Sequence, residues 1–212
     1  QLRLSSVVAT GGVTGFTASG ALFNSFPAII ADNLANPTNA PQTVTYTFEG
    51  SIGGTCINPA QQVVVVTVNP APPDLSITNL TPNICVGTPN DITLTSLTTG
   101  AVITLTNVNY NGATGTLVNG TTFTPGSKIT ETLGNPSSSP IVVTYTFQVA
   151  ANGCTNPATQ STTVTVKPLP VFSILNSAPA ICSGSVTDIT LNTPTSGGVV
   201  RLDAVSYGAV TG

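Results

Sequence analysis

The sequence predicts an all-β protein, and the first observation behind this is its composition. Hydrophobic residues make up 40% of the 212 positions and charged residues only 5%. Val, Ile and Leu alternate with Thr, Ser and Asn, a mixture that favours strands. Twenty glycines and seventeen prolines interrupt the chain, and both residue types disfavour helices.

The second observation is an internal repeat. "ICVGTPNDITL" at 84–94 returns as "ICSGSVTDITL" at 181–191, and "VTYTF" at 44–48 returns at 143–147. The period is about 98 residues, which is too long for a solenoid unit and fits a row of small domains.

The repeat predicts three domains, of which only 73–170 is a complete copy. Residues 1–72 lack the opening strands of a copy, and residues 171–212 lack the closing ones. We therefore expect the natural polypeptide to be longer, with flanking repeats as partners of both outer pieces.

In the complete copy, apolar runs between turn signals predict six strands and one additional short strand. The six lie near 75–79, 90–96, 101–107, 127–133, 141–149 and 160–166, and the additional one near 116–123. The strand at 141–149 alternates most clearly, with Val143, Tyr145 and Phe147 on one face. About seven short strands in 100 residues predict a two-sheet, immunoglobulin-like sandwich.

Proline-rich linkers separate the copies. "VNPAPP" occupies 68–73 and "VKPLP" occupies 166–170. Proline restricts φ and favours semi-rigid, extended linkers. We therefore expect the sandwiches to be joined end to end.

Several functions are excluded or disfavoured by the residues present. The net charge is −3, with four basic residues, so nucleic-acid binding lacks its positive surface. No apolar run is long enough to insert into a membrane. Histidine is absent, which excludes Ser-His-Asp and Cys-His catalysis. No catalytic residue, cofactor site or metal site is predicted, and the chain is not expected to be an enzyme.

The acidic residues have two interpretations. The favoured one is that all seven solvate turns and strand edges; they are Asp32, Glu49, Asp74, Asp91, Glu131, Asp188 and Asp203. The alternative is a calcium site at Asp91 and Asp188, although one acid per copy is few for an ion that requires six to eight oxygens. Tyr46 and Tyr145 are expected to pack in the core because each lies on an alternating apolar face.

Four cysteines in a charge-poor, Thr-rich chain indicate an extracellular protein with disulfides. Two pairings are open. One joins Cys85 to Cys154 within a copy and leaves Cys56 and Cys182 to partners outside the chain; the other crosses the linkers. We expect the pairing within a copy, because the turn that holds Cys154 lies too far from the next domain for a Cα separation of about 7 Å.

The ordered motifs "ICxG", "DITL", "VTYTF", "NGCTNPA" and "TVTVKPLP" together resemble the PKD-like, immunoglobulin-like repeats of giant bacterial surface adhesins. Such adhesins are exported by the type IX secretion system and include the gliding-motility adhesin. The resemblance implies a stalk or filament on the cell surface, with the secretion and anchoring machinery as partners. The alternatives are a carbohydrate- or ligand-binding module with surface glycans as partners, and a non-catalytic accessory region of a secreted enzyme.

Overall fold

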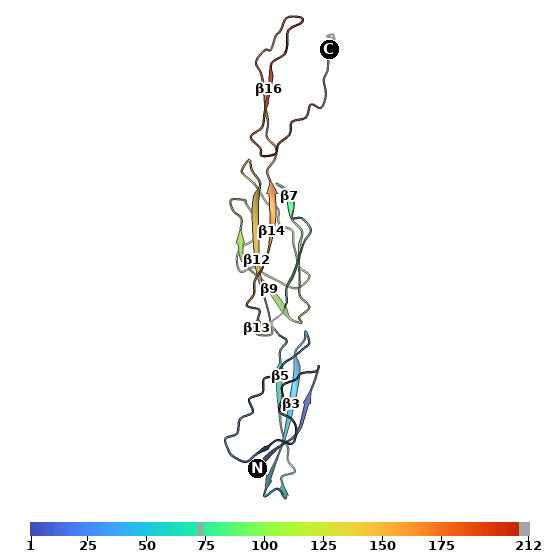
Figure 1. Ribbon diagram of the computed structural model, residues 1–212, viewed down its shortest axis with the longest axis vertical. Helices are drawn as coiled ribbons and strands as arrows, with labels where there is room; N and C mark the ends of the chain where they lie inside the picture. The colour runs from blue at the N-terminus through green and yellow to red at the C-terminus, as the bar shows by residue number, and fades with distance from the viewer. Residues whose placement is uncertain (72–73, 208–212) are drawn as a thin grey trace.

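The structure is a computed structural model that describes residues 1–71 and 74–207. Every regular element in these residues is a β-strand, so the predicted all-β class is confirmed. The chain forms an N-terminal sheet, a central sandwich and a C-terminal hairpin, which follow one another along the long axis (Figure 1).

The N-terminal sheet contains the first five strands. They are β1 (Leu2–Ala9), β2 (Leu22–Phe23), β3 (Gln42–Ile52), β4 (Cys56–Ile57) and β5 (Gln62–Val68). Strand β3 lies between β1 and β5 and pairs antiparallel with both. This sheet has a small buried cluster of Leu4, Val13, Val44 and Tyr46.

The central sandwich has two sheets. The larger contains β7 (Asn83–Cys85), β9 (Ala101–Asn109), β10 (Thr122–Phe123), β12 (Ile141–Ala151), β13 (Cys154–Thr155) and β14 (Gln160–Lys167). The smaller contains β6 (Ser76–Asn79), β8 (Ile92–Thr95) and β11 (Lys128–Ile129). The two sheets enclose one apolar core, to which β12 contributes most.

The alternation expected in β12 is confirmed. Val143, Tyr145 and Phe147 are fully buried, whereas Val142, on the opposite face, is 43% exposed. Phe147 also meets Phe123 edge to face, with ring centroids 6.3 Å apart. A strand with one apolar face thus covers one side of the core, as period-two alternation requires.

Two predicted strands are much shorter in the structure, and one observed strand lies outside the predicted ranges. The runs at 116–123 and 127–133 yield only the two-residue strands β10 and β11. The remaining residues form loops, because the backbone amides of Thr116 and Leu117 donate to the Glu131 side chain and the amide of Glu131 donates to the Asn90 side chain. "NIC" forms an edge strand, β7, which pairs parallel with the end of β14.

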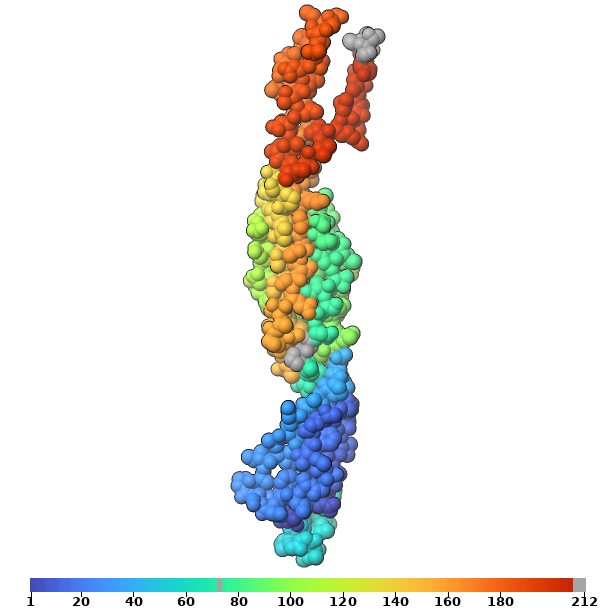
Figure 2. All heavy atoms as spheres, viewed as in Figure 1, coloured from blue at the N-terminus to red at the C-terminus, as the bar shows by residue number. Residues whose placement is uncertain are grey.

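The C-terminal hairpin consists of β15 (Ser173–Asn176) and β16 (Ile189–Asn192), which pair antiparallel. Residues 198–207 contain no strand. In the space-filling view these two parts of the C-terminal segment stand as separate thin arms above the sandwich (Figure 2). Every residue of β15 and β16 is exposed.

Candidate functional site

The first candidate feature is a loop that occurs at one end of the N-terminal sheet and again at one end of the central sandwich. Asn36 donates from Nδ2 to the carbonyls of Ala40 and Val68, both at 2.8 Å. Asn135, 99 positions on, donates in the same way to Ser139 at 2.9 Å and Val166 at 2.7 Å. Each asparagine ties its loop to the strand that precedes the proline-rich segment.

These loops form the contact surface for the part of the chain that follows. The amide of Thr99 donates to the carbonyl of Asn39 at 2.8 Å, and the amide of Ser196 donates to the carbonyl of Ser138 at 2.8 Å. Both donors stand before a Gly at the same place in "TTG" and "TSG". The same hydrogen bond therefore occurs at both junctions between the three parts of the molecule.

The prolines nearest these contacts are also equivalent. Pro70 and Pro168 are both buried, although each lies in a connecting segment. At the first junction the Asn69 side chain also donates to the carbonyl of Asn152 at 2.5 Å. The connecting segments are therefore packed against their neighbours.

A buried carboxylate is the second feature. Glu131 is 7% exposed and accepts hydrogen bonds from the hydroxyls of Tyr110 at 2.6 Å and Tyr145 at 2.7 Å. The amides of Thr116 and Leu117 donate to the same carboxylate. Burial raises the pKa of Glu131, but these hydrogen bonds outweigh burial and hold that pKa below its ordinary value.

The N-terminal sheet repeats this arrangement with a shorter acid. Asp32 accepts from the hydroxyl of Tyr46 at 2.5 Å and from the amide and hydroxyl of Thr17 at 3.0 and 2.6 Å. Burial and the Asp32 carboxylate raise the pKa of Tyr46 to about 12. Glu131 is bonded to Tyr145 on β12, and Asp32 is bonded to Tyr46 on β3. Each carboxylate thus anchors a loop to the long strand of its sheet, so its role is structural.

The prediction for the two tyrosines is confirmed, whereas the prediction for the acidic residues is wrong at one position. Tyr46 and Tyr145 pack in the core, as expected, at 5% and 0% exposure. The expectation that every acid solvates a turn or strand edge is wrong for Glu131, because two tyrosine hydroxyls and two backbone amides replace its water.

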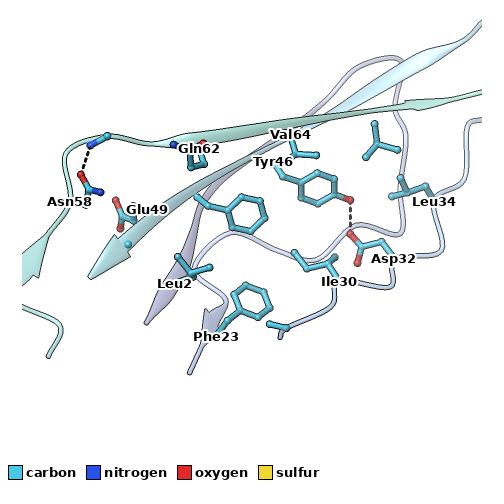
Figure 3. Close-up of a pocket in the computed structure, with 15 residues that line it drawn as sticks. Leu2, Phe23, Ile30, Asp32, Leu34, Tyr46, Glu49, Asn58, Gln62 and Val64 are labelled. Atoms are coloured by element: carbon cyan, nitrogen blue, oxygen red, sulfur yellow. Dashed lines mark hydrogen bonds between the residues drawn. The ribbon is translucent and has the colours of Figure 1, made fainter. Parts of the chain in front are cut away.

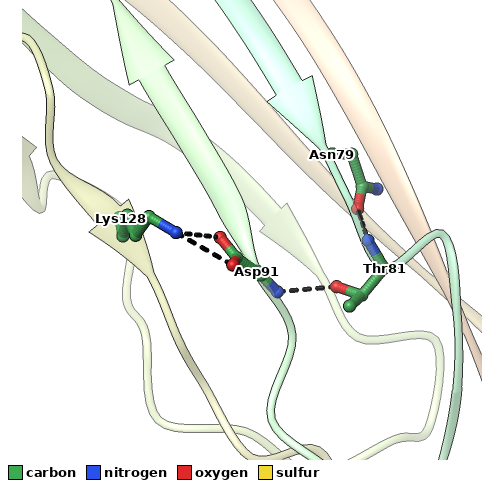
Figure 4. Close-up of polar contacts among 4 residues, drawn as sticks. All are labelled: Asn79, Thr81, Asp91 and Lys128. Atoms are coloured by element: carbon green, nitrogen blue, oxygen red, sulfur yellow. Dashed lines mark hydrogen bonds and ion pairs between the residues drawn. The ribbon is translucent and has the colours of Figure 1, made fainter.

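Asp91, the residue considered for calcium, faces a lysine. Its carboxylate is 2.9 Å from Nζ of Lys128, and its amide donates to the hydroxyl of Thr81 at 2.6 Å (Figure 4). Thr81 is in turn held through its amide by Asn79. Within residues 1–71 and 74–207, no three acidic or cysteine side chains gather in a way that could hold a metal ion.

The predicted disulfide between Cys85 and Cys154 is wrong, because both cysteines are unbridged in the structure. Cys85 pairs opposite Lys167 at one end of β14, while Cys154 pairs with Ala151 beyond the other end. The seven residue steps of β14 separate them by roughly 23 Å, far beyond the reach of a disulfide. Cys56 and Cys182 are unbridged and exposed.

The third feature is an apolar groove in the N-terminal sheet, with a volume of about 640 Å³. Phe23, Ile30, Tyr46 and Val64 line it, and the Tyr46–Asp32 hydrogen bond lies on its wall (Figure 3). The corresponding face of β12 and β14 is covered by the smaller sheet of the central sandwich. Within residues 1–71 and 74–207, no second sheet packs on the face that holds the groove.

Sequence reasoning missed Asn36, Asn90 and Asn135. Asn90 is 1% exposed, donates to the hydroxyl of Tyr145 at 3.1 Å and accepts from the amide of Glu131 at 2.8 Å. The recurrence of "NP" at 36–37 and 135–136 was a usable signal for the two loop asparagines.

In the described part of the chain, no helix is long and apolar enough to cross a membrane. No protein-family model matches the chain, and no curated protein matches it either.

Proposed function

We propose that the chain is a stretch of stalk or filament repeats from a large secreted cell-surface adhesin, of the kind used in attachment or gliding motility. In this proposal, PKD-like or immunoglobulin-like sandwiches are joined end to end by the proline-rich segments. The observation that carries it is the recurrence of one junction. The amide of Thr99 and the amide of Ser196 bond to equivalent loop carbonyls.

A recurring junction suits a mechanical role for a physical reason. A stalk must keep each domain at the same angle to the next, which needs a packed linker and an identical contact at every step. The buried prolines Pro70 and Pro168 provide the first, and the loops held by Asn36 and Asn135 provide the second.

We expect small-angle scattering of the chain in solution to show an elongated particle. Three units as long as the 11-residue strand β12 extend over roughly 110 Å and give a radius of gyration of about 30 Å. A compact globule of this length has a radius of gyration of about 17 Å. A measured value near that of the globule would contradict the stalk.

Surface location has its own test. Antibodies raised against the chain should label intact cells of the source organism, and mild protease treatment of those cells should remove the label. Labelling only after the cells are permeabilised would contradict a cell-surface adhesin.

The alternative function is a ligand-binding module. The groove supports it, because the carboxylates of Asp32 and Glu49 lie among the apolar residues that line it. A glycan array separates the two functions. The stalk proposal expects no glycan to bind the described segment. Saturable binding that is lost in Tyr46→Ala, but kept in Tyr110→Ala, would favour the module.

A further inference from the structure

The chain enters and leaves the central sandwich at opposite ends of the long axis. It enters beside the N-terminal sheet, just before β6, and it leaves from the end of β14 toward the C-terminal hairpin (Figure 1). Tension along the chain therefore pulls β6 and β14 in opposite directions. Resistance to such tension depends on what joins the first strands of the sandwich to the last one.

Strand β7 joins the entering part of the chain directly to β14. The two strands run parallel over three residue pairs. The amide of Thr165 donates to the carbonyl of Pro82 at 2.9 Å, just before these pairs. The amide of Val86 donates to the carbonyl of Lys167 at 2.9 Å, just after them. The pairing is therefore continued by a hydrogen bond at each of its ends.

Side chains hold the same two strands together beneath this pairing. Ile84 lies opposite Val166, and the two residues are 5% and 0% exposed. Both belong to the apolar core that the two sheets enclose. Sliding β7 along β14 would therefore disturb the core as well as the backbone hydrogen bonds.

The parallel direction decides how tension acts on these hydrogen bonds. Tension pulls β7 toward the start of the chain and β14 toward its end, so the strands are drawn along each other rather than apart sideways. Hydrogen bonds between strands lie across the strand direction, so all of them must stretch together. When a hairpin is opened from its end, by contrast, its hydrogen bonds break one at a time, and each step requires less force.

Asn79, at the end of β6, bonds the entering segment to β14 at a second point. Its Nδ2 donates to the carbonyl of Thr163 at 2.9 Å and to the hydroxyl of Thr162 at 3.2 Å. Its Oδ1 accepts from the amide of Thr81 at 2.9 Å, which fixes the turn between β6 and β7 (Figure 4). The entering segment is thus bonded to β14 both before and after this turn.

The sequence of this arrangement recurs along the chain. "NLTPNIC" at 79–85 returns as "NSAPAIC" at 176–182. The turn recurs with it, because Oδ1 of Asn176 accepts from the amide of Ala178 at 3.1 Å. Recurrence of the asparagine, the proline and the turn fits a task that each domain of a row would share.

Strand β14 is held more extensively on its other side. It pairs antiparallel with β12 over seven residues, from Ile141 opposite Val166 to Phe147 opposite Gln160. The entering segment has shorter pairings, since β6 pairs with β8 over four residues and β7 pairs with β14 over three. Tension therefore acts first on the attachment of β6 and β7.

We propose that the pairing of β7 with β14, together with the Asn79 side chain, is a mechanical clamp that keeps the sandwich folded when its two ends are pulled apart. The proposal deepens the stalk function and rests on it for its use, because a stalk carries tension from one domain to the next. The clamp itself is a property of the sandwich, so its test is separate from the test of cell-surface location.

Single-molecule force spectroscopy in two directions tests the clamp. Handles are attached to cysteines introduced into the full chain, after its four native cysteines are replaced by serine. Ala71→Cys with Leu169→Cys applies force along the chain, through two exposed residues of the connecting segments. Val102→Cys with Thr155→Cys applies force across the larger sheet, because these residues flank Ala150 on opposite sides of β12.

The sandwich should withstand at least about twice as much force along the chain as across the sheet, because only the first direction stretches the β7–β14 hydrogen bonds together. Equal forces in the two directions, or a lower force along the chain, would overturn the clamp. Either result would leave the antibody test of the stalk unaffected, so the two failures are distinguishable.

Asn79→Ala tests the side-chain part of the clamp, and Asn119→Ala is its matched control. Asn119 also bonds a side chain to the backbone of the larger sheet, but it accepts from the amide of Val108 on β9, away from β7 and β14. Under constant tension along the chain, Asn79→Ala should unfold about tenfold faster than the unmodified sandwich, and Asn119→Ala within about twofold of it.

Unfolding in urea gives the comparison without tension. The acceleration caused by Asn79→Ala should be smaller in urea than under tension, because the clamp matters most when the two ends are pulled. An equal acceleration of both variants under tension would overturn the proposal. An acceleration of Asn79→Ala that is as large in urea as under tension would also overturn it, since Asn79 would then contribute only general stability.

Discussion

Replacing Leu94 by alanine is expected to lower the free energy of unfolding of the central sandwich by about 3 kcal/mol. Leu94 lies on β8, is fully buried, and belongs to the core cluster that β12 and β14 cover. The substitution removes three carbon atoms from this core and leaves a cavity. Native-state hydrogen exchange at the amides of β12 measures the loss without requiring the whole chain to unfold in one step.

The matched control is Leu191→Ala. Leu191 stands in the same "DITL" motif but is 53% exposed. Its replacement should change the stability of the central sandwich by less than about 0.5 kcal/mol. Equal losses for the two leucines would mean that β8 does not cover the core as described.

Replacing Glu131 by glutamine is expected to destabilise the central sandwich by about 3 kcal/mol at neutral pH. Tyr110, Thr116 and Leu117 all donate to Oε1 of Glu131, and the single oxygen of glutamine can replace that atom. Its NH2 group then faces the hydroxyl of Tyr145, which donates to Oε2 in the unmodified protein. The pKa of Glu131 is lower in the folded protein than its ordinary value. Its ionised form therefore stabilises the fold above the unfolded pKa, which is about 4.3.

The pH dependence follows from that sign. As the pH falls below about 4.3, the unfolded chain binds a proton before the folded one does, so the unmodified protein loses stability. The difference between the unmodified protein and Glu131→Gln should therefore shrink in acid and level off below the folded pKa. Hydrogen exchange at β12 amides across this range measures the difference.

Asp91→Asn is the control for the acid experiment. Asp91 forms a partly exposed ion pair with Lys128, and such a pair contributes at most about 1 kcal/mol. Its replacement should leave most of the acid-dependent loss in place. If Asp91→Asn removed this loss and Glu131→Gln did not, the buried carboxylate would not be its source.

Local patterns were sufficient for the strands that form the centre of each sheet. The alternation in "VTYTF" placed Tyr46 and Tyr145 in the core correctly, because side-chain direction in a strand follows from position alone. The same alternation puts Val64 and Val66 of β5 on one apolar face. It could not tell that they are 51% and 37% exposed, because burial depends on whether another sheet covers that face.

The buried carboxylate and the disulfide show where local reasoning ended. Nothing near Glu131 in the sequence indicates that Tyr110 and Tyr145 bond to it, since both lie more than ten residues away. The predicted bridge between Cys85 and Cys154 was wrong because β7 pairs with the far end of β14. Strand partners come from topology, which period-two alternation does not encode.

The sequence by itself determined the all-β class, the apolar faces of the long strands and the positions at which motifs recur, because these depend on side-chain chemistry and spacing along one chain. Only the tertiary structure decided which faces are covered, which edges are open and which polar groups meet. Those properties arise between segments far apart in the sequence, such as β7 and β14. The "DITL" leucines illustrate this: Leu94 is fully buried in the central sandwich and Leu191 is 53% exposed in the hairpin, because burial requires a second sheet packed against the strand.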